Sequence, residues 1–128
     1  MERRVVFEGH SSFDHYAISV TDLERSLSFY VNFLGLHTKA RPEFDFNGAW
    51  LTLDDKTEIH LIENKNTSFE LSSSRALHFA FKHPNLKKVV SLCEVNSVQF
   101  KPIKMRPDGI YQLFIKDPDG YWIELCEK

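Results

Sequence analysis

The sequence predicts an α+β fold made of two tandem βαβββ modules. The order strand, helix and three strands occurs twice along the 128 residues, and short motifs recur between the halves. DHYA at 14–17 matches LHFA at 77–80, an offset of 63 residues, and IHL at 59–61 matches IEL at 123–125, an offset of 64. We therefore expect one domain over residues 1–128, with a first module at about 13–63, a linker at 64–75 and a second module at about 76–127.

The first module opens with an alternating segment rich in β-formers, residues 13–20, which predicts a strand. Thr21 and Glu24 have the spacing of a capping box, and apolar residues then recur at helical spacing until Gly35, so a helix is expected next. Three further strands are expected, separated by the turn residues Asn47-Gly48 and 54–56, at about 36–44, 48–54 and 57–63.

The second module repeats this order after the polar, Ser- and Asn-rich linker. Residues 76–82 predict a strand, and Pro84 suits the first turn of a helix whose apolar face includes Leu86 and Cys93. Three strands are expected to follow, near 97–105, 110–116 and 121–126, with turns at 107–109 and 117–120.

Composition limits the partners that the chain is expected to have. A formal net charge of −2 provides no overall positive field for nucleic acid or an anionic membrane surface. The apolar stretch near the N-terminus is too short for a secretory signal, and no apolar run approaches the roughly 20 residues of a membrane-spanning helix. We expect a cytoplasmic protein with no nucleic-acid or membrane partner. Cys93 and Cys126 lie outside any C-x-x-C motif, so both are expected to be buried structural thiols.

Strand alternation places one polar side chain on the face opposite the bulky apolar residues in four strands, the first and last of each module. Within a module these two polar positions are 45 or 46 residues apart. We expect the two sheets to curve around a cavity into which the four side chains project. They are His15, His60, His78 and Glu124.

Three imidazoles and one carboxylate, with no thiolate, suit a first-row divalent ion such as Zn²⁺, Ni²⁺, Co²⁺, Fe²⁺ or Mn²⁺. Four protein ligands in an octahedral site would leave two positions for a substrate that chelates through adjacent oxygens. Such an ion would act as a Lewis acid on a developing negative charge. The remaining histidines, His10, His37 and His83, have no partner in the repeat and are expected at the surface or in loops.

The same alternation selects candidate substrate-binding residues. Trp50 and Thr52 lie opposite the core pair Leu51 and Leu53, and Gln112 and Phe114 lie opposite Leu113 and Ile115. We predict that Trp50, Thr52, Gln112 and Phe114 face the cavity, where they either contact substrate or only fill space. Arg106 and Asp108, near the turn at the mouth, would either bind an anionic group or be solvated.

Several motifs together resemble the vicinal oxygen chelate superfamily, which includes glyoxalase I, fosfomycin-modifying transferases, extradiol dioxygenases and bleomycin-resistance proteins. They are DHYAISV around His15, a helix ending in FY…LGL, EIHL around His60, the His78 strand, and DPDGYWIEL at 117–125. The resemblance covers about residues 13–127 and implies that His15, His60, His78 and Glu124 hold the metal. Glyoxalase I has a Glu where this chain has His60, and the resemblance implies that Glu124 is the proton-shuttling base.

The leading hypothesis is a metal-dependent lyase, isomerase or transferase of the glyoxalase type, acting on a small oxygen-rich substrate. One alternative is a non-catalytic, antibiotic-binding protein of the bleomycin-resistance type, with Trp50 and Phe114 stacking on a planar ligand. Another is an extradiol dioxygenase, which needs only two His and one carboxylate around Fe²⁺. Exposed sheet edges in so short a chain predict a homodimer. The resemblance implies a site shared between subunits, with His15 and His60 from one and His78 and Glu124 from the other.

Overall fold

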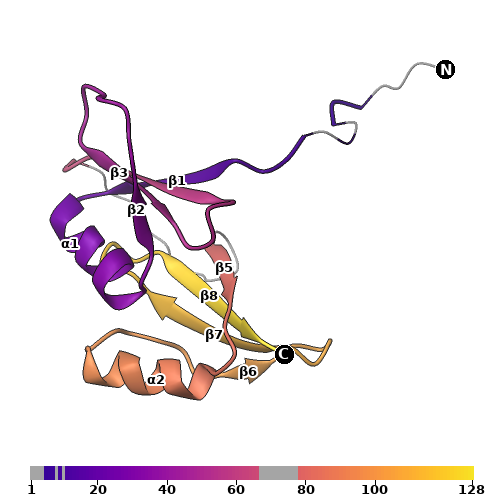
Figure 1. Cartoon of the computed structure of the whole chain (residues 1–128). Helices are drawn as coiled ribbons and strands as arrows, with labels where there is room; N and C mark the ends of the chain where they lie inside the picture. Colours follow the sequence, from indigo (N-terminus) through magenta and orange to yellow (C-terminus); the bar gives the residue numbers. More distant parts are fainter. Residues whose placement is uncertain (1–4, 8, 10, 67–77) are drawn as a thin grey trace.

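The computed structural model describes residues 5–7, 9, 11–66 and 78–128, and it contains two sheets of four strands each (Figure 1). The strand orders are β1-β4-β3-β2 and β5-β8-β7-β6, so the two sheets have the same topology. In each, the first strand of the module pairs in parallel with the last, and the remaining pairs are antiparallel. The predicted α+β fold with a repeated βαβββ order is confirmed. No helix in the described residues is long and apolar enough to cross a membrane.

The ladders place the candidate ligands on neighbouring strands. In the first sheet, Ala17 of β1 lies opposite His60 of β4, and in the second, Ala80 of β5 lies opposite Glu124 of β8. His15 and His78 are two residues earlier on β1 and β5, on the same faces as these alanines. The strands are β1 (His15–Val20), β2 (His37–Lys39), β3 (Gly48–Thr52), β4 (Glu58–Glu63), β5 (His78–Lys82), β6 (Lys104–Met105), β7 (Tyr111–Lys116) and β8 (Trp122–Glu127).

The first helix differs from its prediction in two ways. It is α-helical only as α1 (Leu23–Leu27) and continues as the π-helical segment η1 (Ser28–Phe33). The capping box is wrong: the N-cap is Asp22, whose carboxylate accepts a hydrogen bond from the Arg25 amide at 3.2 Å. Thr21 does not serve as the cap because its hydroxyl donates to Asp119, a residue nearly a hundred positions later in the sequence.

The second helix, α2 (Leu86–Val95), follows its prediction, with Asn85 as the N-cap. Two predicted strands are much shorter than expected. Segment 36–44 forms a strand only at β2, and segment 97–105 only at β6 with an isolated bridge at Phe100. Each long segment contains a proline, Pro42 or Pro102, which has no amide proton to give to a ladder. Residues 67–77, which include most of the predicted linker, lie outside the described residues.

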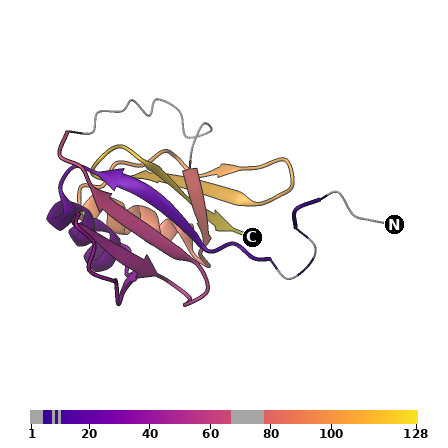
Figure 2. The same ribbon diagram turned by 90° about the horizontal axis from the view of Figure 1, so that it is seen from above.

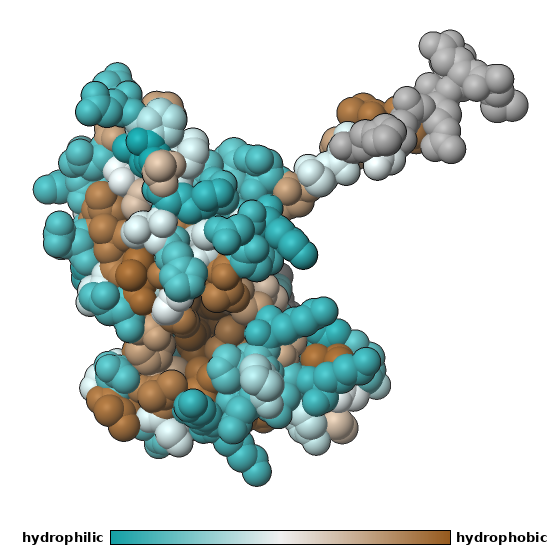
Figure 3. All heavy atoms as spheres, in the orientation of Figure 1, coloured by the Kyte–Doolittle hydropathy of each residue, from teal (hydrophilic) through white to brown (hydrophobic). Residues whose placement is uncertain are grey.

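The apolar faces of both sheets contribute to one hydrophobic core, so the ligand-bearing faces lie on the outer sides of the sheets. Figure 3 shows apolar side chains gathered where the two modules meet, with hydrophilic side chains over the outer parts. The described residues before β1 extend away from the two sheets (Figures 1 and 2). Cys93 is buried as predicted, whereas Cys126 is only partly buried. Core residues from both modules include Ile18, Val20, Leu51, Leu61, Leu86, Leu113, Ile115, Ile123 and Leu125.

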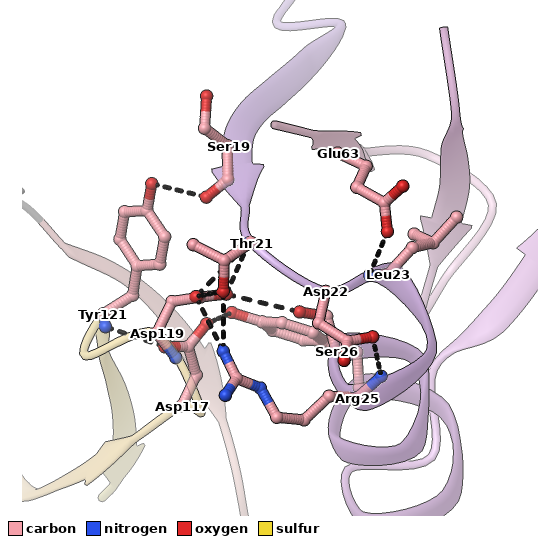
Figure 4. Close-up of polar contacts among 11 residues, drawn as sticks. Ser19, Thr21, Asp22, Leu23, Arg25, Ser26, Glu63, Asp117, Asp119 and Tyr121 are labelled. Carbon is pink, nitrogen blue, oxygen red and sulfur yellow. Dashed lines mark hydrogen bonds and ion pairs between the residues drawn. The ribbon is translucent and has the colours of Figure 1, made fainter. Parts of the chain in front are cut away.

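A polar turn between β7 and β8, residues 117–120, joins the second module to the first helix (Figure 4). The Asp119 carboxylate accepts hydrogen bonds from the Thr21 hydroxyl at 2.6 Å and from the Arg25 guanidinium at 3.0 Å. The Tyr30 hydroxyl donates to the buried carboxylate of Asp117 at 2.6 Å. Burial raises the pKa of Asp117 despite this hydrogen bond. The turn therefore carries charge that donors from the first module stabilise.

Replacing Tyr30 by Phe should destabilise the fold without altering either ligand pair. The substitution leaves the ring in the core but removes a donor from a buried carboxylate, which typically costs about 1–3 kcal/mol. The free energy of unfolding is measured with urea at neutral pH. The control is Tyr111→Phe at an exposed tyrosine, which should unfold like the wild type. Equal stability of both variants would show that the Tyr30–Asp117 bond does not join the modules.

Candidate metal site

In the first module, His15 and His60 lie face to face. Their rings stack with centroids 4.0 Å apart and planes 13° apart. Trp50 also stacks on His60, at 4.3 Å and 4°. Trp50 lies directly opposite His60 in the β3–β4 ladder, which brings the rings together. The aromatic contacts fix the orientation of the buried His60 ring, while the His15 side chain is 42% exposed.

Carboxylates hold both imidazoles of this pair. The Asp14 carboxylate lies 2.6 Å from Nδ1 of His15, and the Glu58 carboxylate lies 2.9 Å from Nε2 of His60. Lys39 Nζ donates to the second oxygen of Glu58 at 2.6 Å. Hydrogen bonds from Lys39 and then from His60 lower the pKa of Glu58. Histidines that bind metals usually have such a carboxylate partner, which selects the tautomer.

In the second module, His78 Nε2 lies 3.0 Å from Oε1 of Glu124. Glu124 is 4% exposed, and its other oxygen, Oε2, accepts hydrogen bonds from the Cys126 thiol at 2.8 Å and from the Gln112 amide at 3.1 Å. The Arg106 guanidinium lies 3.7 Å from the same oxygen and forms an ion pair with Asp108. The Glu124 carboxylate is therefore surrounded by donors from β7, from β8 and from the turn that precedes β7.

The protonation states in the second module follow from these contacts. Burial alone would raise the pKa of Glu124, but hydrogen bonds from Cys126 and Gln112 and the charges of His78 and Arg106 outweigh burial and lower it. Burial, reinforced by the neighbouring Glu124, raises the pKa of the Cys126 thiol to about 11. At neutral pH Glu124 is therefore a carboxylate and Cys126 a thiol that donates to it.

A cavity of about 530 Å³ opens beside the His78–Glu124 pair. Phe114, whose ring meets His78 edge-on at 5.5 Å, forms part of its wall. Three basic residues, Lys101, Lys104 and Arg106, also line this cavity. The sequence had left open whether Arg106 and Asp108 bind an anion or are solvated, and the structure pairs them with each other beside the cavity.

Comparison with known proteins identifies the family. Residues 12–125 match the model of the glyoxalase/bleomycin resistance protein/dioxygenase superfamily. The chain belongs to this superfamily. A protein named lactoylglutathione lyase from Salmonella typhimurium is 30% identical over 88% of this chain and 90% of its own length. The protein named glyoxylase I 4 from Arabidopsis thaliana is 28% identical over 91% of this chain and 70% of its own length.

Solved structures of the superfamily have the same fold. A glyoxalase/dioxygenase from Nostoc punctiforme has a TM-score of 0.80 and 23% identity, covering 100% of this chain and 99% of its own. A glyoxalase family protein from Bacillus anthracis has a TM-score of 0.77 and 20% identity, covering 96% of this chain and 99% of its own. At these identities the likeness supports the fold of this superfamily member and does not select a reaction.

The four predicted ligands lie in two pairs, one in each module. Within the described residues, no group of three or more His, Cys, Asp or Glu side chains is arranged to hold a metal ion. Their assignment as metal ligands stays a prediction. Of the other histidines, His37 is exposed and His83 half-buried, while His10 lies outside the described residues.

The four predicted substrate contacts have different surroundings. Trp50 and Phe114 pack against candidate ligands, and Gln112 binds Glu124. Thr52 is 2% exposed. Its hydroxyl donates to the Thr57 carbonyl and accepts from the Asp55 amide, both at 2.9 Å, so it organises the β3–β4 turn. A contact between any of the four and substrate stays a prediction.

Two residues next to the candidate ligands, Glu58 and Cys126, were not predicted from the sequence as part of the site. Each is two positions from a candidate ligand on the same strand, Glu58 before His60 and Cys126 after Glu124. Strand alternation, which was used to find the ligands, places them on the same faces. The sequence therefore contains a signal for both residues, although the lack of a C-x-x-C motif favours a core position for Cys126.

Both pairs have the chemistry of ligands for a divalent ion, and the second pair also has the spacing. Two ligands at about 2.1 Å from one ion, in cis positions, lie roughly 3 Å apart. The separation of 3.0 Å between His78 Nε2 and Glu124 Oε1 matches this value. In the first pair, Asp14 contacts Nδ1 of His15, and Glu58 contacts Nε2 of His60. The ring nitrogens not held by these carboxylates are Nε2 of His15 and Nδ1 of His60. Each pair could therefore supply two of the four ligands.

Replacing Lys39 by Met should raise the pKa of Glu58 toward its ordinary value of 4.5, because the hydrogen bond from Lys39 is the largest cause of its lowering. The Glu58 carboxyl is followed by ¹³C NMR during a pH titration of metal-free protein. Lys56→Met, at an exposed lysine in the β3–β4 turn, is the control and should leave the Glu58 titration unchanged. An unchanged titration in Lys39→Met would contradict this ion pair.

Proposed function

We propose that this protein is a divalent-metal-dependent lyase, isomerase or transferase of the glyoxalase type. Its substrate is a small oxygen-rich molecule that chelates the ion through two oxygens, and its site is assembled between two copies of the chain. The ion is Zn²⁺, Ni²⁺, Co²⁺, Fe²⁺ or Mn²⁺, held by His15, His60, His78 and Glu124. The observation that carries the proposal is the division of these four residues into two pairs of neighbouring side chains, of which His78 and Glu124 have a separation that suits one ion.

The position of each pair in its sheet supports assembly between subunits. The inner strands β4 and β8 carry the buried ligands His60 and Glu124. The sheet-edge strands β1 and β5 carry the more exposed ligands, and the alanines beside them, Ala17 and Ala80, are exposed. An exposed strand next to half of a site is a surface that a second copy can cover. Two identical copies related by a twofold axis would complete two sites at once.

The bound ion would act as a Lewis acid that polarises the two chelating oxygens of the substrate. Glu124 would act as the base that takes a proton from the substrate, because it is a carboxylate at neutral pH. Its Oε1 lies 3.0 Å from His78 Nε2, at the proposed site. Asp14 and Glu58 would hold the tautomers of His15 and His60. Trp50 and Phe114 would exclude water by packing against the ligands.

The names of relatives support an enzyme and suggest the first assay. Lactoylglutathione lyases match nearly the whole chain, although at only about 30% identity. Lactoylglutathione lyase activity is therefore the first reaction to measure. Glyoxalase I of the glutathione-dependent kind has a Glu where this chain has His60 and tends to have an Arg where this chain has Ser19. The use of a different cosubstrate, or of none, is therefore an outcome of that assay.

Mixing two inactive subunits tests the shared site. His15→Ala and Glu124→Ala remove one ligand from each pair. If each site takes one pair from each subunit, a mixed dimer has one complete site and one site that lacks two ligands. Metal binding, read by elemental analysis after gel filtration, should be near one ion per subunit in wild type. It should be strongly reduced in each variant and return to about half an ion per subunit in an isolated mixed dimer.

Four results would contradict the proposal. A monomer at micromolar concentration would exclude a shared site. Mixed dimers without restored binding would contradict a site that takes one pair from each subunit. Wild-type protein that binds none of the five metals more tightly than millimolar would favour a metal-independent binding protein of the bleomycin-resistance type, whereas oxygen uptake with catechol after anaerobic Fe²⁺ loading would favour an extradiol dioxygenase.

The basic lining of the second-module cavity favours a substrate that carries negative charge. Inorganic phosphate is a simple probe, followed by amide chemical shifts in the metal-free protein. Lys104→Met should weaken phosphate binding about 2- to 5-fold, because an exposed cation contributes roughly 1 kcal/mol or less. Lys87→Met, on the exposed surface of α2, should leave it unchanged. Equal affinities in the two variants would remove Lys104 from substrate binding.

A further inference from the structure

We infer that Cys126 and Gln112 are positioning residues that hold one oxygen of Glu124, Oε2, and so direct the other, Oε1, toward His78 and the metal. The hydrogen bonding stands by itself, while its consequence for metal binding rests on the proposed function. The inference changes the part assigned to Gln112, from contact with substrate to orientation of a ligand.

The β7–β8 ladder explains why these donors meet at one atom. Cys126 is two residues after Glu124 and lies on the same face of β8, and Gln112 is directly opposite Cys126 on β7. Their donor atoms lie 2.8 and 3.1 Å from Oε2. They approach from two different strands, so rotation of the carboxylate would break both hydrogen bonds together.

The burial of Glu124 makes these donors important. A carboxylate that is 4% exposed has little access to water and depends on protein donors to remain charged. Each carboxylate oxygen has two lone pairs, and those of Oε2 are used by the thiol and the amide. Oε1, 3.0 Å from His78 Nε2, is then the oxygen available to an ion shared with that histidine. The geometry therefore favours coordination through one oxygen.

Arg106 does not replace either donor. Its guanidinium lies 3.7 Å from Oε2, beyond hydrogen-bond distance, and forms an ion pair with Asp108. It contributes charge to the surroundings of Glu124 without fixing the direction of the carboxylate. The orientation thus depends on two neutral side chains, neither of which is a metal ligand in the proposed site.

Cobalt binding provides a test with a spectroscopic readout. Co²⁺ is titrated into purified full-length protein, and both its dissociation constant and its visible absorption spectrum are recorded. Cys126→Ala and Gln112→Met each remove one hydrogen-bond donor to Glu124 and change the rest of the side chain little. Each should weaken Co²⁺ binding about 10- to 100-fold and change the visible spectrum. Cys126→Ser keeps a donor at the same position and should bind Co²⁺ within about threefold of wild type.

The matched control is Cys93→Ala, which makes the same substitution at a buried cysteine of α2. It should lower the free energy of unfolding and leave the Co²⁺ affinity and spectrum as in wild type. A general effect of destabilisation would instead weaken binding in Cys93→Ala as well. Wild-type affinity and spectrum in Cys126→Ala and in Gln112→Met would overturn the inference.

A second measurement separates this inference from the proposed function. Crystal structures of metal-free wild type and Cys126→Ala would show whether Glu124 loses its single orientation when the thiol is removed. If wild type binds no Co²⁺, the proposed function fails, and this structural comparison still decides the positioning role. An unchanged Glu124 side chain in Cys126→Ala would show that the thiol does not hold it.

Discussion

The hydrogen bonding between the β7–β8 turn and the beginning of the first helix determines how the two modules of this chain are placed. Asp117 and Asp119 supply the acceptors of this interface, and Thr21, Arg25 and Tyr30 supply the donors. The Tyr121 hydroxyl adds a hydrogen bond to the Ser19 carbonyl at the end of β1. Since a buried carboxylate without donors costs several kcal/mol, these contacts fix one relative placement of the modules. That placement lets the apolar faces of both sheets share one core and leaves both ligand faces outside it.

The two modules have the same topology but different chemistry around their ligands. In the first, both candidate ligands are imidazoles, and the nearby carboxylates Asp14 and Glu58 are their partners. In the second, the carboxylate is itself a candidate ligand, and neutral donors hold it. Basic residues line the cavity of the second module. The duplicated fold thus places its two pairs of candidate ligands in different surroundings, one with carboxylate partners and one with neutral donors and basic side chains nearby.

The two candidate ligands of each module differ in burial. The inner-strand ligands His60 and Glu124 are enclosed, so their orientation is fixed by neighbours such as Trp50 and Gln112. The edge-strand ligands His15 and His78 are more exposed and remain accessible to whatever covers the edges. The two candidate ligands of each pair therefore differ in how closely their neighbours hold them. The superfamily fold provides this arrangement, and the individual side chains decide what the site would bind.

The sequence by itself determined the repeated βαβββ order and the residue pairs that share a face, because strand alternation and turn chemistry are local properties. His15 with His60 and His78 with Glu124 could be paired from their spacing, and the same alternation contained Glu58 and Cys126. Only the tertiary structure decided that Thr21 binds Asp119 instead of capping α1, and that the Tyr30 hydroxyl donates to Asp117. It also decided that the two ligand pairs remain separate within the described residues. These features depend on contacts between residues far apart in the sequence, and local periodicity contains no information about which distant donor reaches a given carboxylate.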